Sequence, residues 1–330
     1  MKKRICIFIG SIAIAVSAGA QGPGSSGSYY QDADGKTGAE LKTALCAIIY
    51  NRTERTYGDL WTDFCTTDVR DDGKVWDMYS GISNFTFGTD QDPGSGNKEG
   101  QYYNREHSWP NSWFGGKVQP MYTDLHHMYP TDKMVNNRRS NYPFGETAGE
   151  DYMSANGFSK LGACTYPGYK GKVFEPNDEY KGDFARTYFY MVTCYEEKLS
   201  DWYHNYGDKE GVQPTIDGST YPGLTTWQLE MLMSWAERDP VSEKETKRNE
   251  AVSKIQNNRN PFIDYPGLEQ YIWGDKQQLP FSYAGFDSGV REITRNFALG
   301  SSRLYDLQGR RVTDPQKGLY VRNGKKYIVR

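Results

Sequence analysis

The chain has 330 residues, a formal net charge of −3 and an aromatic share of 15%, including 26 Tyr and 8 Trp. This length allows one large domain or two, and the aromatic content is ample for a sizeable core, which argues against a disordered protein. The slightly acidic balance excludes a globally basic nucleic-acid binder. A local basic groove is still compatible with it.

Residues 1–20 have the organisation of a secretory signal. Three basic residues at positions 2–4 precede an apolar run over 5–16, and small residues follow at 18–20. The apolar run is too short to span a bilayer, and no later stretch approaches the length needed. We therefore expect cleavage near Ala20 and a secreted protein in the periplasm, at the cell surface or outside the cell. Its formal charge would fall to about −6, because three positive charges leave with the signal.

Four cysteines would remain after cleavage: Cys46, Cys65, Cys164 and Cys194. An exported protein can form disulfides, but pairing depends on distances that the sequence does not contain. One disulfide and none are equally open at this stage. Metal binding by these cysteines is not expected, because they form no C-x-x-C pair and have no histidine at zinc-site spacing.

The spacing of apolar residues predicts helices over residues 38–57, 183–199, 227–237 and 242–257, the second of them buried along one side. The Gly-, Ser- and Asp-rich residues 21–36 favour a loose leader before the first helix. The last helix carries more basic than acidic residues, so it should present a basic face. We interpret it as a candidate second wall of a substrate groove, contacting phosphates and sugars.

The densest group of polar residues lies within residues 103–145, which contain three of the four histidines. Glu106 and His107 precede a loop marked by two glycines, and residues 124–129 then alternate like a short strand. Residues 130–131 offer a start for a helix. We therefore expect a strand, a loop, a strand and a helix in succession.

The helix of this motif should place further polar side chains on one face. Asp132, Asn136 and Arg139 recur at a spacing of three or four. Packed onto the hairpin, this face brings Asn136 and Arg139 within reach of Glu106 and His107.

These residue types suit hydrolysis of a phosphodiester. A neutral imidazole can take a proton from water at physiological pH, and a carboxylate and a carboxamide oxygen can hold Mg²⁺ while leaving positions for water and phosphate. The metal would stabilise the charge that develops in the transition state. A guanidinium such as that of Arg139 could clamp the non-bridging oxygens.

Four blocks of the chain are REHSWP, YTDLHHMYPTDKMVNNRRSN, KGDFARTYFYM and RNEAVSKIQNNRNPFIDYPGLEQYIW. In these blocks and their order the chain resembles the bacterial endonuclease I family of non-specific periplasmic and secreted nucleases, which carry a ββα-metal (His-Me finger) site. The resemblance implies His107 as the general base, and Glu106 with Asn136 as the protein ligands of one Mg²⁺, which Mn²⁺ or Ca²⁺ could replace. It also implies products with 5′-phosphate ends.

One part of the pattern departs from some relatives, which place a phosphate-binding arginine in the loop between the two strands. Here the loop over 108–123 holds only Lys117 as a basic residue. Arg139 and Arg259 are therefore the candidates for the phosphate clamp, with Arg248 and Lys117 as further substrate-binding residues. The alternatives, if both candidates prove silent, are Lys117, Arg105 and Arg138.

His126 and His127 are adjacent, so on a strand they would point to opposite faces and at most one would face the site. A structural hydrogen bond to the hairpin backbone is at least as good an interpretation. Two other functional classes stay open. A zinc hydrolase could use His107, His126 and His127, whereas a non-catalytic surface or carbohydrate-binding protein, rich in tyrosine, would bind and cut nothing.

The last residues, 300–330, indicate three short strands joined by Gly-containing turns. They resemble the end of the C-terminal sorting domains (type IX) of Bacteroidetes secreted proteins, although the tail is shorter than a full domain. The resemblance implies export through an outer-membrane secretion machinery and no part in catalysis.

We predict a mixed α+β fold, mostly helical, over residues 21–295, with the ββα motif as its catalytic insert and a short β tail over 300–330. The expected protein is a monomeric Mg²⁺-dependent endonuclease that hydrolyses DNA and RNA without a stable protein partner. Which nucleic acid it prefers is not predicted, because backbone recognition leaves no base-reading signature in a sequence.

Overall fold

The computed structural model describes residues 22–207, 210–286, 290–293, 304–305, 311–312, 315–322 and 325–329. The predicted signal over residues 1–20 lies outside this part of the chain. Within the described part, every helix is too short or too polar to cross a bilayer.

The described chain is mixed α+β and mostly helical, as predicted. Its α-helices are α1 (Gly38–Ile49), α2 (Leu60–Thr67), α3 (Lys133–Arg139), α4 (Lys181–Cys194), α5 (Leu199–Asn205), α6 (Val212–Thr215), α7 (Thr226–Arg238), α8 (Glu243–Gln256), α9 (Pro261–Asp264) and α10 (Leu268–Ile272). Short 3-10 helices are η1 (Gln31–Ala33), η2 (Asn111–Phe114), η3 (Met121–Thr123), η4 (Ala155–Gly157), η5 (Asp178–Tyr180) and η6 (Glu196–Lys198).

The strands form three small sheets. They are β1 (Tyr103–His107), β2 (Met128–Asp132), β3 (Tyr152–Met153), β4 (Lys160–Ala163), β5 (Lys172–Glu175), β6 (Val290–Ile293), β7 (Leu304–Tyr305), β8 (Arg311–Val312), β9 (Gly318–Arg322) and β10 (Lys325–Val329). The sheet orders are β1-β2, β3-β4-β5 and β6-β10-β9-β7-β8.

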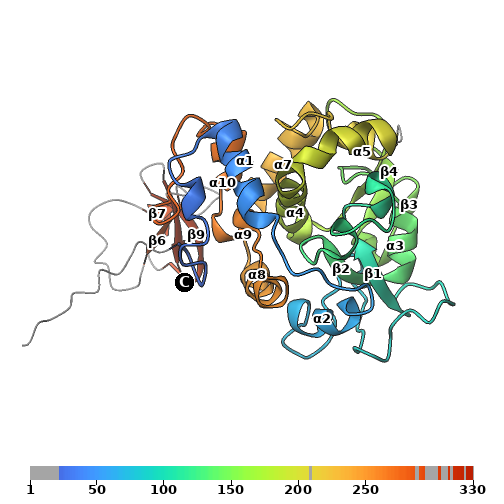
Figure 1. Ribbon diagram of the computed structural model, residues 1–330. Helices are drawn as coiled ribbons and strands as arrows, with labels where there is room; N and C mark the ends of the chain where they lie inside the picture. The colour runs from blue at the N-terminus through green and yellow to red at the C-terminus, as the bar shows by residue number, and fades with distance from the viewer. Residues whose placement is uncertain are drawn as a thin grey trace, which may run out of the picture.

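Helix α4 is the centre of the helical body (Figure 1). It packs against α1, α7 and α9, and all 14 of its residues are buried. Its most polar residue, Arg186, is bonded to Glu245 on α8 at 2.5 Å, which satisfies a charge that would otherwise be costly to bury. The prediction of burial along one side is therefore wrong, because helices from distant parts of the chain enclose α4.

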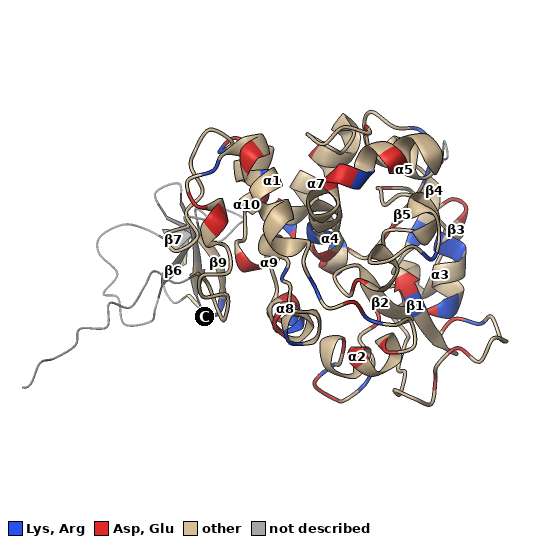
Figure 2. Ribbon diagram, viewed as in Figure 1, with Lys and Arg blue, Asp and Glu red and all other residues tan. Residues whose placement is uncertain are grey.

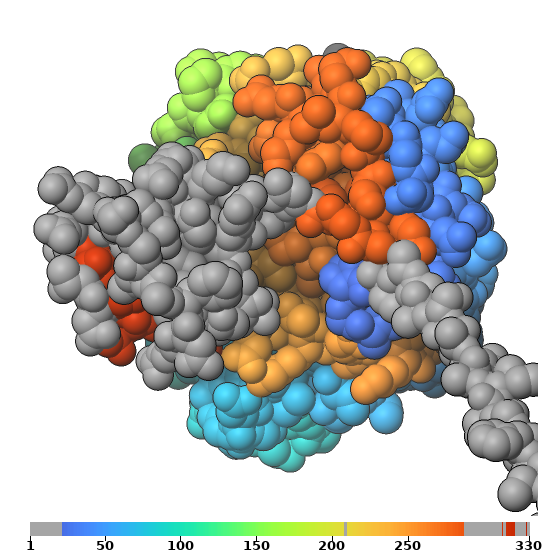
Figure 3. Space-filling model, turned by 90° about the vertical axis from the view of Figure 1, so that its left-hand side faces the viewer, coloured from blue at the N-terminus to red at the C-terminus, as the bar shows by residue number. Residues whose placement is uncertain are grey.

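The segment before α1 is docked, so the prediction of a loose leader is also wrong. Tyr30 and Ala33 are fully buried, and the Tyr30 hydroxyl donates to Asp264 at 2.7 Å. Figure 3 shows the N-terminal part of the chain (blue) beside the region of α8 to α10 (orange) on one face. A buried tyrosine with a bonded hydroxyl gives this Gly- and Ser-rich segment its anchor.

The hairpin that carries the candidate site is formed by β1 and β2, which pair antiparallel with Glu106 opposite Tyr129. The first strand lies where it was predicted. The second strand does not lie over 124–129 but begins at Met128, and Pro130 is inside it. The ribbon tolerates this proline because, among the described residues, β2 pairs on one side only, with β1.

Helix α3 follows the hairpin directly, and it begins at Lys133, later than the predicted start at 130–131. Asp132 is its N-cap: one carboxylate oxygen accepts from the backbone N–H groups of Met134 and Val135, and the other accepts from Gly100. This cap decides where the helix begins. The helix itself is the one predicted to face the hairpin.

The C-terminal segment forms strands near the three predicted positions, and β8 is an additional one. The predicted main body extends to residue 295, but β6, which lies within it, pairs in parallel with β10. This strand therefore belongs to the sheet of the C-terminal segment.

The four cysteines of the described chain are free thiols: Cys46, Cys65, Cys164 and Cys194. The sequence left one disulfide and none equally open, and the structure has no disulfide among these four cysteines.

Candidate active site

His107 is the last residue of β1 and is held by one hydrogen bond. Its Nε2 lies 2.9 Å from the backbone oxygen of Tyr122. Because a carbonyl oxygen can only accept, Nε2 carries the proton and the lone pair lies on Nδ1. Burial lowers the pKa of His107 to about 3, so the ring is neutral at physiological pH. The imidazole is thus in the form that can accept a proton.

Aromatic rings hold the orientation of this imidazole. The Tyr122 ring stacks on it at 5.0 Å between centroids, and the Tyr57 ring lies nearly parallel to it at 6.1 Å. The two tyrosine rings also stack on each other at 4.6 Å. The His107 ring therefore packs beside two stacked tyrosine rings, one from the segment before α2 and one from η3.

Glu106 is buried beside His107, with 4% of its surface exposed. Its Oε1 accepts a hydrogen bond from the Tyr79 hydroxyl at 2.8 Å and from Arg139 Nη1 at 3.1 Å. Burial raises the pKa of Glu106 to about 7, and the charge of Arg139 and the bond from Tyr79 oppose that rise. Both bonds converge on one carboxylate oxygen.

Arg139 projects from α3 onto the hairpin and is almost completely buried. Besides Glu106, its guanidinium donates to the backbone oxygens of His107 at 3.1 Å and Ser108 at 2.6 Å. These partners direct the guanidinium at the protein rather than at solvent. The geometry favours a role in positioning Glu106 and the end of β1 over the predicted clamp on phosphate.

Asn136 lies one turn before Arg139 on α3, and hydrogen bonding from its side chain is among the causes that oppose the rise of the Glu106 pKa. Its Nδ2 also donates to Asn104 Oδ1 at 2.8 Å, which leaves the Asn136 Oδ1 as an available acceptor. Glu106 and Asn136 each offer a hard oxygen donor of the kind that Mg²⁺ prefers. Asp132, on the same predicted helical face, uses both of its carboxylate oxygens within the protein, one of them as the cap of α3.

Two of the predicted substrate-binding arginines are buried in ion pairs. Arg248 on α8 contacts Asp68 at 2.8 Å, and Arg259 contacts Asp264 at 2.7 Å. The central arginine of the predicted basic face of α8 therefore faces inward, whereas Lys247 and Lys254 on the same helix are exposed. Lys117, in the loop between the strands, is exposed. Figure 2 shows acidic residues interspersed among the basic ones across the molecule.

His126 and His127 are both buried and lie before β2, so the predicted alternation on a strand is wrong for them. His127 Nε2 lies 2.6 Å from the Met121 oxygen, and burial lowers the pKa values of His126 and His127 to about 3 and about 4. The backbone N–H of His126 donates to Asp124 at 3.1 Å. These contacts favour structural hydrogen bonding over a catalytic role for the two histidines.

A zinc site built from the three histidines is not supported by the geometry. Over the residues that the structure describes, no three His, Cys, Asp or Glu side chains converge as metal ligands would. His107, His126 and His127 each direct Nε2 at a different backbone oxygen.

Sequence reasoning missed the residues that orient the site. Tyr79 holds Glu106, Asn104 holds the Asn136 amide, and the Tyr122 backbone orients His107. Asn104 could have been found, because it alternates with Glu106 on β1. Tyr79 comes from a loop far away in the chain and left no local signal.

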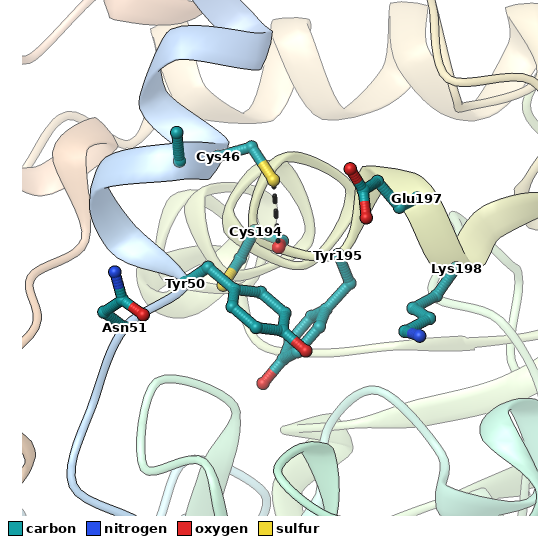
Figure 4. A pocket seen from close by; sticks show the side chains of 8 residues that line it. Cys46, Tyr50, Asn51, Cys194, Tyr195, Glu197 and Lys198 are labelled. Atoms are coloured by element: carbon teal, nitrogen blue, oxygen red, sulfur yellow. Dashed lines mark hydrogen bonds between the residues drawn. The ribbon is translucent and has the colours of Figure 1, made fainter. Parts of the chain in front are cut away.

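A cavity of about 170 Å³ lies between α1 and the end of α4 (Figure 4). Two free cysteines line it, and burial raises the pKa of Cys46 to about 12 and that of Cys194 to about 11. Neither is a ready nucleophile at neutral pH. The lining includes no residue of β1, β2 or α3, so the cavity is separate from the candidate site.

A family model described as Endonuclease I matches residues 37–267, which include the hairpin, α3 and most of the helical body. The chain belongs to the Endonuclease I family. An extracellular ribonuclease of Bacillus subtilis (strain 168) is 37% identical over 254 residues, covering 74% of this chain and 78% of the relative. A relative of the same name in Bacillus amyloliquefaciens is 37% identical over 249 residues, with the same two coverages. An extracellular deoxyribonuclease of Aeromonas hydrophila is 27% identical over 143 residues, covering 43% of this chain and 49% of the relative.

Proposed function

We propose that this Endonuclease I family member is a secreted, metal-dependent, non-specific endonuclease that hydrolyses phosphodiester bonds of DNA and RNA and leaves 5′-phosphate ends. The observation that carries the proposal is the hydrogen bond from His107 Nε2 to the Tyr122 oxygen. It leaves Nδ1 as the proton acceptor of a neutral imidazole, which is the group that activation of water requires.

In the proposed mechanism, His107 takes a proton from a water molecule, and that water attacks phosphorus in line with the departing 3′-oxygen. Glu106 and Asn136 would hold a divalent cation, which supplies charge stabilisation at the phosphate and at the leaving oxygen. Tyr79 and Arg139 hold the Glu106 carboxylate in place through its Oε1. Glu106 and His107 are consecutive at the end of β1, so the proposed cation ligand and the proposed base are supplied by adjacent residues.

The names of the relatives support a substrate range that includes both nucleic acids. Two are named as ribonucleases and one as a deoxyribonuclease. A site that acts on the backbone through a base, a cation and buried positioning groups has no evident means of reading bases. Relatives are named as extracellular, and one as periplasmic. These names support secretion of this protein as well. Export through an outer-membrane machinery by way of residues 300–330 is a further part of the proposal.

The test is incubation of the purified mature protein with plasmid DNA and with a structured RNA, in EDTA and in Mg²⁺. We expect cleavage of both substrates in Mg²⁺ and none in EDTA, and the products should be ligatable through 5′-phosphates. Activity lost on zinc chelation and not restored by Mg²⁺ would indicate a zinc hydrolase instead. Binding without cleavage in every divalent metal would indicate a non-catalytic protein.

The ligand assignment is tested by titrating Mg²⁺ against the Glu106→Gln and Asn136→Ala variants. Each removes one of very few protein oxygens, so half-maximal activity should move to a higher Mg²⁺ concentration, and calorimetric binding of Mn²⁺ should weaken in parallel. A wild-type titration in the Asn136→Ala variant would remove that residue from the metal site. Asn177→Ala, which alters an amide outside the site, serves as the control.

A further inference from the structure

Arg105 differs from most arginines of this protein in having no carboxylate partner. Residues 22–286 contain ten arginines, and eight of them form an ion pair, among them Arg139, Arg248 and Arg259. Among the residues of this range that the structure describes, all but 208 and 209, Arg105 and Arg138 are the arginines that form no ion pair. Arg138 lies over the Tyr152 ring on the exposed side of α3, whereas Arg105 is on β1, two residues before His107. Its charge is therefore not neutralised and lies near the candidate base.

Two aromatic rings hold the Arg105 guanidinium. Its Cζ lies 3.6 Å from the centre of the Tyr57 ring and 4.2 Å from that of Trp61. One nitrogen, Nη1, donates to the Tyr57 backbone oxygen at 2.6 Å. Contacts of this kind restrict the rotamers of a long side chain, so little freedom is left to lose when a ligand binds.

The same guanidinium keeps donors available. Its Nε is buried without a partner among the described residues, and its Nη2 has no protein acceptor there but is not buried. A buried charged donor without an acceptor lowers the stability of the folded protein. An anion bound to the exposed Nη2 would interact with the positive charge of the whole guanidinium and offset part of that loss. Arg105, Tyr57 and Trp61 are each partly exposed, so an anion can approach.

The Tyr57 ring connects Arg105 to the catalytic residue. It lies 3.6 Å from the Arg105 Cζ and is nearly parallel to the His107 ring, at an interplanar angle of 11° and 6.1 Å between centroids. Arg105 and His107 also alternate on β1, so both side chains leave the same side of the strand. A phosphodiester that meets His107 therefore comes close to the guanidinium.

We propose that Arg105 is the phosphate-binding residue of this site, contacting a non-bridging oxygen of the nucleic-acid backbone through Nη2, with Tyr57 and Trp61 as positioning residues. This inference rests on the proposed nuclease function. It gives Arg105 the role that the sequence assigned to Arg139 or Arg259. Because the contact is to phosphate, it serves DNA and RNA alike.

The guanidinium is held in place before substrate arrives, so the contact forms in the ground state as well as in the transition state. Interactions of that kind change KM more than kcat. Arg105→Gln should therefore raise KM about tenfold and leave kcat within about threefold of wild type. The salt dependence of oligonucleotide binding should flatten by roughly one counterion.

The experiment measures kcat and KM on a DNA and an RNA oligonucleotide, and measures binding of both by fluorescence anisotropy at several salt concentrations in a His107→Ala background. Arg238→Gln is the matched control, because it removes the same charge from Arg238 on α7, which pairs with Glu146 at the surface. Arg105→Lys should keep the wild-type salt slope but bind more weakly, since it lacks the planar fork. Trp61→Leu should weaken binding without changing the slope, as expected for a positioning residue.

An Arg105→Gln variant with the KM and slope of Arg238→Gln would overturn the inference while the nuclease function stood. So would a loss confined to DNA or to RNA. If Arg105→Gln does not fold, the Arg105→Lys variant tests the inference instead. The lysine keeps the positive charge, so a folded variant whose salt slope of binding is reduced by one counterion would contradict the proposed contact with phosphate. Failure of the wild-type protein to bind or cut either nucleic acid would overturn both proposals.

Discussion

Burial acts in opposite directions on the pKa values of two neighbouring groups at the end of β1. It raises the pKa of Glu106 to about 7 and lowers that of His107 to about 3, because water stabilises the carboxylate anion and the imidazolium cation alike. Both residues are thereby biased toward their neutral forms. A neutral imidazole can accept a proton, and a carboxyl with a raised pKa is readily ionised when a cation approaches.

His107 should be indispensable for cleavage. His107→Ala is expected to lower the rate at least about a hundredfold, because it removes the proton acceptor while the neighbouring tyrosine rings remain. Plasmid cleavage and circular dichroism provide the measurement. His204→Ala is the control, since His204 is exposed on α5 and belongs to neither strand of the hairpin nor to α3. Near-normal cleavage by a correctly folded His107→Ala variant would remove this residue from the mechanism.

Arg139 should matter for stability as well as for catalysis. Arg139→Ala leaves Glu106 buried without its cation, and breaking a buried pair in this way costs about 3–5 kcal/mol of the free energy of unfolding. The variant should also have a lower kcat and need more Mg²⁺, because the Glu106 pKa rises further. Denaturant unfolding and Mg²⁺ titration test this. Wild-type stability combined with a raised KM alone would instead favour direct contact between Arg139 and phosphate.

At the scale of elements, the position of Asn136 depends on where α3 begins. The Asp132 carboxylate accepts from two N–H groups of the first turn of α3 and from Gly100 in the preceding loop. A cap of this kind ties the helix to the hairpin, since Asp132 is also the last residue of β2. The geometry of the proposed metal site thus depends on a residue that touches no metal.

Asp132→Ala should lower the free energy of unfolding by about 1–2 kcal/mol through the lost cap. It should also raise the Mg²⁺ concentration for half-maximal cleavage, because the first turn of α3 no longer holds Asn136 in register. Asp132→Asn should recover much of both properties. Asn177→Ala removes a comparable cap from η5 and should cost stability without moving the metal titration. An unchanged titration in Asp132→Ala would separate the cap from the site.

At the scale of the whole molecule, neutral histidines are buried where the hairpin meets the helical body. His126 is 2% exposed, lies 4.5 Å from the Tyr190 ring of α4, and has its pKa lowered to about 3 by burial. In the unfolded chain its pKa would return to about 6.5. Between these values the unfolded state binds one more proton than the folded state, so stability decreases as pH falls from about 6.5.

His126→Gln should therefore show a weaker loss of stability at acid pH than the wild type. As pH falls from 6 to 4, the wild type should lose about 1.4 kcal/mol more unfolding free energy per pH unit than the variant. The comparison isolates His126, because Asp77 and Asp239, whose pKa values burial raises to about 7, are common to both proteins. Denaturant unfolding at four pH values measures it, and parallel curves would contradict it.

The sequence alone was sufficient for the family, the mostly helical α+β class, the order of strand, loop, strand and helix, and the identity of Glu106, His107 and Asn136 as candidates. Periodicity and motif order are properties of the sequence itself, so they can be recognised before the tertiary structure is known. The structure packs α3 against β1 and β2, so Asn136 and Glu106 lie on adjoining elements, while their chemical roles remain predictions.

Only the tertiary structure decided which charged groups face solvent. Arg248 and Arg139 have the same local pattern as surface arginines, but their carboxylate partners are 180 and 33 residues away in the chain. Tyr79 reaches Glu106 across 27 residues, and Tyr57 and Trp61 reach Arg105 from the segment before β1. The strength of an ion pair, a pKa shift and the exposure of a guanidinium all depend on neighbours that folding supplies from distant segments, and a local pattern carries no record of them.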